Sequence, residues 1–84
     1  MTFTYKPQGV CSRVITFDID ENLIVSNIAF TGGCGGNTQG VSKLAEGMNA
    51  HELIKRLKGI ECGMRPTSCP DQLASAVEAA LEEM

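Results

Sequence analysis

The chain has 84 residues, of which 43% are hydrophobic, and a formal net charge of −3. This length predicts one domain spanning residues 1–84, and it leaves no room for a large enclosed catalytic domain. The acidic balance argues against a general nucleic-acid binder, which clamps phosphates with clustered Lys and Arg. The N-terminal residues lack the apolar stretch of a signal peptide, and no run is long enough to span a bilayer. We therefore expect a cytoplasmic protein without a membrane partner, in which thiols stay reduced.

The first third of the chain has the pattern of β-strands. Residues 3–5 alternate in a short segment that is typical of an edge strand. Residues 11–19 and 23–30 are rich in β-branched and aromatic side chains, and the polar run 20–22 between them is a turn signal. This arrangement predicts an antiparallel hairpin, to which the first segment can add a third strand.

After the hairpin the apolar period becomes helical. Asn37 or Thr38 can cap a first helix that runs to about Glu46. Asn49 with a glutamate three residues later has the capping-box pattern of a second helix, which Gly59 ends at a left-handed position. The basic residues gather on this central stretch, and we interpret them as a solvated helix face: Lys43, Lys55, Arg56 and Lys58.

A third helix is expected to start at Pro70, because proline is favoured at the first helical position. Its apolar stripe follows the helical period: Leu73, Val77, Ala80, Leu81 and Met84. The fold class is therefore α+β, with a two- or three-stranded antiparallel sheet followed by three helices packed on one face.

Four cysteines are the strongest candidates for chemistry: Cys11, Cys34, Cys62 and Cys69. They lie beside glycines or at a helix start, whereas structural cysteines usually lie inside apolar runs. Cys69 precedes Pro70, which places it at the N-cap of the last helix, where free N–H groups stabilise a thiolate. This pattern indicates a metal or redox site.

The predicted topology brings the cysteines together in pairs. Cys11 begins the first strand of the hairpin and Cys34 follows the second, and these two positions are neighbours in a hairpin. Cys62 and Cys69 are separated by a connection of 6 residues. A site that holds all four would be a tetrathiolate site, whose usual occupants are zinc and iron–sulfur clusters.

Five further residues are candidates for supporting this site. Gly33 and Gly35 flank the second cysteine and let the backbone approach a bound cluster closely. Arg13 and Arg65 lie near the cysteines in sequence and can offset thiolate charge. Asp71 in the first turn of the last helix complements the helix dipole.

Other interpretations stay open. No C-x-x-C pair is present, and the even cysteine count also allows two disulfides or four small buried side chains. The Gly33-x-Gly35 pair begins like a dinucleotide fingerprint, but Thr38 and the lack of a βαβ unit argue against that function. His51 is expected to face solvent on its helix, because no third group supports a Cys–His nucleophile.

Residues 67–71 spell Thr-Ser-Cys-Pro-Asp, the signature after which the TSCPD domain is named. The chain resembles this family from Gly9 through residues 30–37 to the final helix. The family includes a C-terminal module of some ribonucleotide reductases, chiefly cobalamin-dependent ones, and small stand-alone four-cysteine proteins. The resemblance implies an accessory or binding module related to DNA biosynthesis, with a ribonucleotide reductase or another metalloenzyme as partner, and it leaves nucleotide binding open.

The chain is more distantly similar to U-type iron–sulfur cluster scaffolds. Cys11, Cys34 and Cys69 match the places of three scaffold cysteines, in the same hairpin-then-helices order. Those scaffolds carry an aspartate where this chain has Arg13, and Cys62 adds a fourth thiolate that favours a closed site. This similarity implies the alternative function of a cluster assembly scaffold or carrier, although it disfavours labile cluster donation.

Ribonucleotide reduction by this chain alone is not expected. That reaction needs a radical-generating cofactor, a thiyl cysteine and a reducing dithiol inside a large barrel, which 84 residues cannot enclose. A ribonucleoside-diphosphate reductase label would reflect the shared domain. The sequence leaves the metal, the partner and the oligomeric state open.

Overall fold

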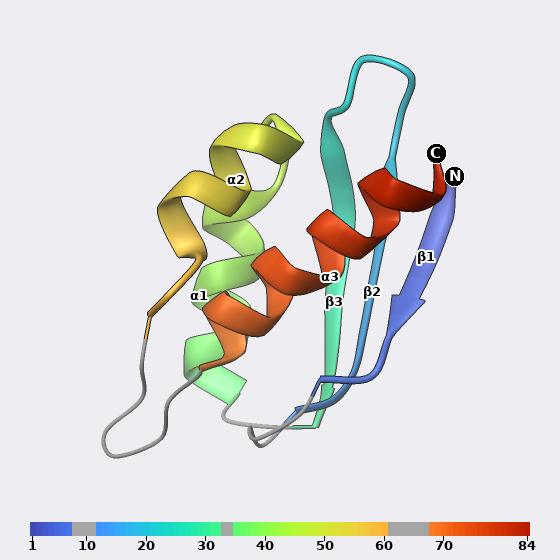
Figure 1. Cartoon of the computed structure of the whole chain (residues 1–84). Coiled ribbons are helices and arrows are strands. Elements are labelled where there is room, and N and C mark those ends of the chain that lie inside the picture. The colour runs from blue at the N-terminus through green and yellow to red at the C-terminus, as the bar shows by residue number, and fades with distance from the viewer. Residues whose placement is uncertain (8–11, 33–34, 61–67) are drawn as a thin grey trace.

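Three strands come first along the chain and three helices follow, as Figure 1 shows. The computed structural model describes residues 1–7, 12–32, 35–60 and 68–84. Its elements in chain order are β1 (Thr2–Tyr5), β2 (Ser12–Ile19), β3 (Val25–Gly32), α1 (Gly35–Ala45), α2 (Ala50–Leu57) and α3 (Cys69–Glu83). The predicted α+β architecture is confirmed, while the likeness to U-type scaffolds stays a prediction.

The sheet is antiparallel with the strand order β1-β2-β3. The short N-terminal segment therefore does add a third strand to the hairpin, as an edge strand. Because side chains alternate along a strand, Ile15, Phe17 and Ile19 of β2 all point to one face and are fully buried there. On that face Phe3 of β1 stacks on Phe17, with ring centroids 5.7 Å apart. One face of the sheet is therefore apolar and needs a cover.

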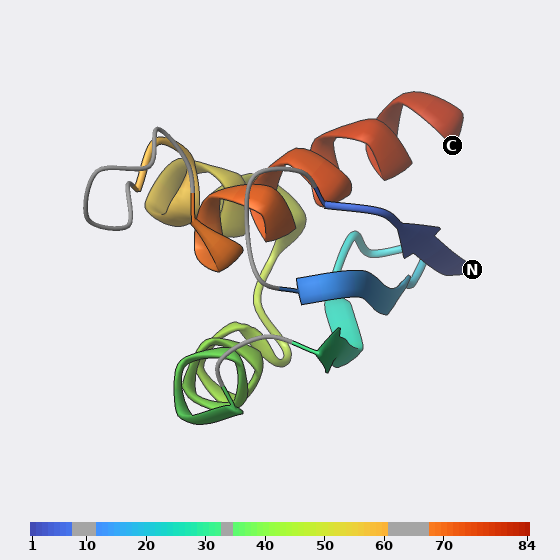
Figure 2. The same cartoon turned by 90° about the horizontal axis from the view of Figure 1, so that it is seen from below.

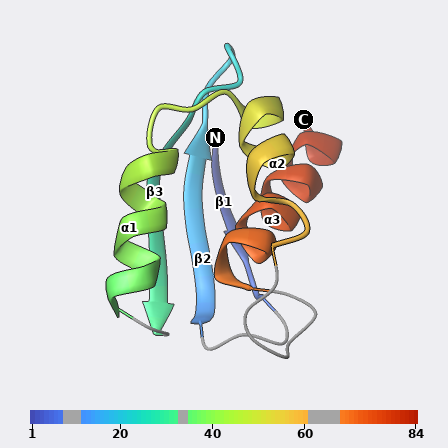
Figure 3. The same cartoon turned by 90° about the vertical axis from the view of Figure 1, so that its left-hand side faces the viewer.

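All three helices supply that cover from the same side, as Figures 2 and 3 show. The core joins the buried strand residues to buried positions on the helices: Ala45, Ala50, Leu53, Leu73, Ala74, Ala76, Val77 and Ala80. Met84 was expected to belong to this stripe but is 49% exposed, because it lies beyond the last residue of α3.

The cap of α2 agrees with the sequence pattern. Asn49 is extended, and its side chain accepts hydrogen bonds from the backbone N–H groups of His51 and Glu52. Gly59 follows the helix with φ +88, the left-handed position expected for it. The first helix differs from the prediction, since α1 begins at Gly35 rather than at a cap of Asn37 or Thr38, with its glycines taking helical backbone.

A bulge in β3 fixes α1 against the sheet edge. The pairing register shifts opposite the stretch between Thr16 and Asp18, and Asn27 has φ 52. Glu46, just after α1, accepts hydrogen bonds from the backbone N–H groups of Asn27 at 2.9 Å and Ile28 at 3.4 Å. The carboxylate thus pairs backbone groups that the bulge frees from the ladder, and it holds the end of α1 beside β3.

Candidate functional site

The start of α3 is built around Ser68 rather than Cys69. Ser68 is extended, with φ −153 and ψ 170, and its Oγ accepts a hydrogen bond of 3.2 Å from the Asp71 N–H. The expected N-cap role of Cys69 is therefore wrong: Cys69 is the first residue of the helix and is only 6% exposed. A serine hydroxyl is among the strongest capping groups, which explains why the cap falls one residue earlier.

Two side chains at this helix start also hold the end of α2. Ser68 Oγ donates a 2.6 Å hydrogen bond to the carbonyl oxygen of Ile60. Asp71 Oδ1 accepts a 2.7 Å hydrogen bond from the backbone N–H of Gly59. Asp71 lies in the first turn of α3, where a carboxylate complements the dipole, and it also bridges two helices while mostly buried. The sequence did not reveal this second role.

The hairpin brings a second pair of segments together at the same end of the molecule. Ser12, the first residue of β2, lies opposite Gly32, the last residue of β3. Figures 1 and 3 show that the start of α1 and the start of α3 also lie at this end. The starts of β2, α1 and α3 and the end of β3, which border the cysteines in sequence, therefore lie at one end of the molecule (Figures 1 and 3).

Most of the predicted site residues fall outside the described residues: Cys11, Gly33, Cys34, Cys62 and Arg65. Gly35 is the first residue of α1. Arg13 lies on β2, where the register shifts between Ser12 and Val14. Among the described residues no three His, Cys, Asp or Glu side chains are grouped to hold a metal ion. The four-cysteine site and its supporting residues therefore stay a prediction.

Two further expectations concern the described helices. His51 is exposed near the start of α2, as expected for a solvent-facing residue.

In the part of the chain that the structure describes, no helix has both the length and the apolarity to cross a membrane.

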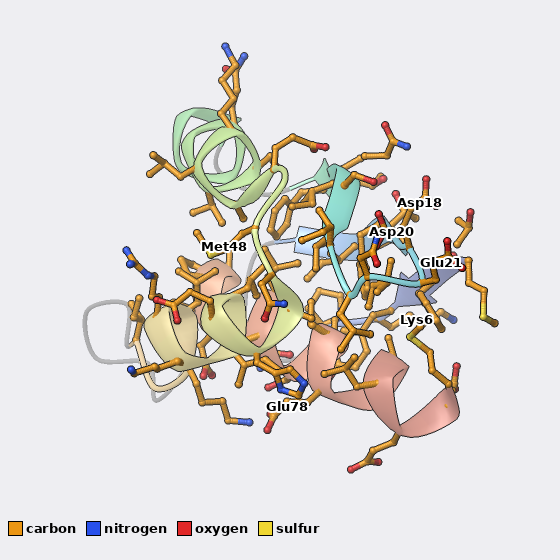
Figure 4. The ribbon with its side chains drawn as sticks, turned by 90° about the horizontal axis from the view of Figure 1, so that it is seen from above. Lys6, Asp18, Asp20, Glu21, Met48 and Glu78 are labelled. Atoms are coloured by element: carbon orange, nitrogen blue, oxygen red, sulfur yellow. The ribbon has the colours of Figure 1, made fainter. Side chains whose placement is uncertain are left out.

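An apolar groove between α1 and α2 is a second candidate site that the sequence did not reveal. Its volume is about 300 Å³, and Figure 4 shows Met48 between the two helices. We call it the α1/α2 groove, and its lining is Val41, Leu44, Ala45, Met48, Arg56 and Leu57. The spacing 41, 44, 45 and 48 was an available signal, because it forms an apolar helix stripe on the sequence alone.

A row of polar contacts crosses β1, β2 and β3. Asp18 accepts hydrogen bonds from Thr2 Oγ1 at 2.5 Å and from Asn27 Nδ2 at 2.7 Å. These two hydrogen bonds, first that of Thr2, lower the pKa of Asp18 below its ordinary value. Figure 4 shows Asp18 with Asp20 and Glu21 on the side of the molecule away from Met48.

The comparisons with known proteins give one match. The model of the TSCPD domain family matches residues 3–81, which is nearly the whole chain. No curated protein and no solved structure matches this chain. With the signature at the start of α3 and a family match over the sheet and all three helices, the chain belongs to the TSCPD domain family.

Proposed function

We propose that this TSCPD domain is a small accessory module whose four cysteines share one metal centre and whose partner is a ribonucleotide reductase or another metalloenzyme of the cytoplasm. The centre would be zinc or an iron–sulfur cluster, held by Cys11, Cys34, Cys62 and Cys69. Four thiolates are a soft donor set that suits either occupant. Such a centre would stabilise the fold and preserve a docking surface, without catalysis by this chain alone.

One observation carries this proposal: both cysteines of each pair lie within two residues of a contact that the structure describes. Cys11 and Cys34 flank the pairing of Ser12 with Gly32. Cys62 and Cys69 follow the two residues of the 2.6 Å Ser68–Ile60 hydrogen bond, by two residues and by one. Two residues of chain span at most about 7 Å, so these contacts limit the separation within each pair.

The chain's own residues have defined parts in this proposal. Ser68 and Asp71 hold the start of α3 against the end of α2, which fixes the place of Cys69. Cys69 is mostly buried, so a ligand there would be shielded from water. Arg13 and Arg65 would offset part of the negative charge of the thiolates.

The test is elemental analysis and an absorption spectrum of protein purified without oxygen. Zinc in a colourless protein supports the accessory module with a structural metal. A brown protein with iron and sulfide identifies the centre as a cluster. A protein with neither metal and four reactive thiols would overturn the proposal.

Variants then assign the ligands. Cys69→Ser should lose metal and melt at a lower temperature, because metal binding contributes to folding in a small domain. Ala74→Ser is the matched control, since Ala74 is buried in the same helix and the change adds a hydroxyl without removing a thiol. It should lower the melting temperature and keep the metal. Full metal content in Cys69→Ser would exclude Cys69 as a ligand.

A further inference from the structure

The α1/α2 groove combines an apolar lining with a leucine side chain, Leu44, that is largely exposed to solvent. Leu44 is 81% exposed, although it lies beside the half-buried Val41, Met48 and Leu57 of the same groove. A single exposed leucine is common on protein surfaces. A leucine continuous with an apolar groove is different, because burying it together with the groove against a partner removes contiguous apolar surface from water.

Among the described residues of the lining, Arg56 supplies the one charged side chain. Its Nε donates a 2.7 Å hydrogen bond to Glu52, and its side chain is 65% exposed. Within the described part of the chain the two terminal amino groups of Arg56 make no hydrogen bond. An arginine fork of this kind is suited to a carboxylate, which it binds through two parallel hydrogen bonds.

We propose that the α1/α2 groove binds an acidic amphipathic helix of a partner protein. Its aliphatic side chains lie in the groove beside Leu44, and one of its carboxylates binds the terminal amino groups of Arg56. A groove between two helices accepts a third helix through apolar residues at helical spacing. This inference deepens the proposed accessory role by naming the chemistry of the partner, and it does not depend on the metal.

Charge complementarity favours this occupant over a second copy of the chain. Among the described residues that line the groove, the charged side chain is that of Arg56, and it is positive. A symmetric dimer through this face would bring like charges together. Ordinary small-molecule sites surround most of their ligand and converge several polar groups on it, whereas this groove is open and its described lining includes a single charged group.

The experiment uses two synthetic peptides of about four helical turns. Both carry leucine at helical spacing; one has glutamate at the flanking positions and the other has lysine there. Methyl NMR spectra of the full chain report the contact residue by residue. The glutamate peptide should shift the methyl signals of Val41, Leu44, Met48 and Leu57, and the lysine peptide should bind at least about tenfold more weakly.

Matched variants separate the apolar contact from the charged one. Leu44→Gln and Arg56→Glu should each weaken binding of the glutamate peptide by about tenfold, which corresponds to about 1.4 kcal/mol. Met84→Gln changes another exposed apolar side chain outside the groove, and Lys6→Glu reverses an exposed positive charge that lies away from the groove (Figure 4). These two controls should stay within about threefold of the native chain.

Three outcomes would overturn the proposal. They are absent methyl shifts in the groove, equal binding of the two peptides, and self-association through the groove that Leu44→Gln abolishes. The last outcome would identify a second copy as the occupant. Metal content is measured separately, so a failed groove is distinguishable from a failed cysteine centre.

Discussion

The carboxylate of Asp71 in the first turn of α3 accepts a 2.7 Å hydrogen bond from the backbone N–H of Gly59, just after α2. The two residues are twelve positions apart in sequence. Beside them Ser68 Oγ donates to the carbonyl oxygen of Ile60. Together these hydrogen bonds join the two ends of the connection between α2 and α3. Cys62 lies in this connection in the sequence, and Cys69 is the first residue after it. We call these four residues, Gly59, Ile60, Ser68 and Asp71, the helix corner, and it would support the proposed centre.

Removing the Asp71 carboxylate should loosen this corner. Asp71→Ala leaves the Gly59 N–H without its acceptor, and we expect a loss of about 1–3 kcal/mol in the free energy of unfolding. Urea unfolding measures the loss, and hydrogen exchange at Gly59 should become faster. Asp71→Asn keeps an acceptor oxygen and should lose less. Equal losses in both variants would show that the hydrogen bond to Gly59 is not what matters.

Two glycines provide a matched test of backbone conformation. A Cβ at Gly40 or at Gly47 would meet no atom within 4 Å, but Gly47 has φ +80 whereas Gly40 lies inside α1. Gly40→Ala should therefore stabilise the fold by about 0.5–1 kcal/mol through helix propensity. Gly47→Ala should destabilise it by about 1–2 kcal/mol, because left-handed backbone is unfavourable for alanine. Thermal melts decide, and effects of the same sign would contradict this account.

The strands and the last two helices were accessible from sequence because their signals are local. Alternation in β2 and the helical stripe of α3 report directly which face is buried. The cap at Asn49 was equally readable, since its pattern lies within four residues. Such features depend on the segment itself and little on its neighbours.

The remaining features depend on contacts between segments. The cap at Ser68 was missed because proline suggested a later helix start, whereas Ser68 is fixed by Ile60 as well as by its own helix. Glu46 accepts a hydrogen bond from the bulged Asn27 and so holds the end of α1 beside β3, and Leu44 on that helix is 81% exposed. The apolar stripe at 41, 44, 45 and 48 can be read from the sequence, but no local pattern encodes where that helix sits, so the sequence did not reveal that this stripe lines the α1/α2 groove.

Acid should weaken the stabilisation that Asp18 gives the sheet through its hydrogen bonds with Thr2 and Asn27. Its pKa is lowered from about 3.8 by the hydrogen bonds of Thr2 and Asn27, so its contribution to stability is present above that pH. The contribution is lost as the pH falls through the lowered value in the folded state. Asp18→Asn should therefore be less stable than the native chain at neutral pH, and the difference should shrink as the pH falls through the lowered pKa of Asp18.

Urea unfolding at several pH values measures this difference. Glu82→Gln is the control for the loss of one negative charge, because among the described residues the Glu82 side chain makes no hydrogen bond or ion pair. A difference for Asp18→Asn that does not change between neutral and acid pH would show that the carboxylate charge is not involved.

Arg13 offers a test of the charge balance around the proposed centre. The likeness to U-type scaffolds stays a prediction, and it would place an aspartate at this position, so Arg13→Asp reverses the charge there. A carboxylate beside a thiolate-rich centre raises thiol pKa values and favours protonation over metal binding. We expect slow metal release to a chelator from the native protein and severalfold faster release from Arg13→Asp, with Arg13→Gln between them. Lys55→Asp, on the exposed face of α2, controls for net charge and should leave the release rate unchanged. Equal rates for the native chain and Arg13→Asp would mean that Arg13 does not contribute to metal retention.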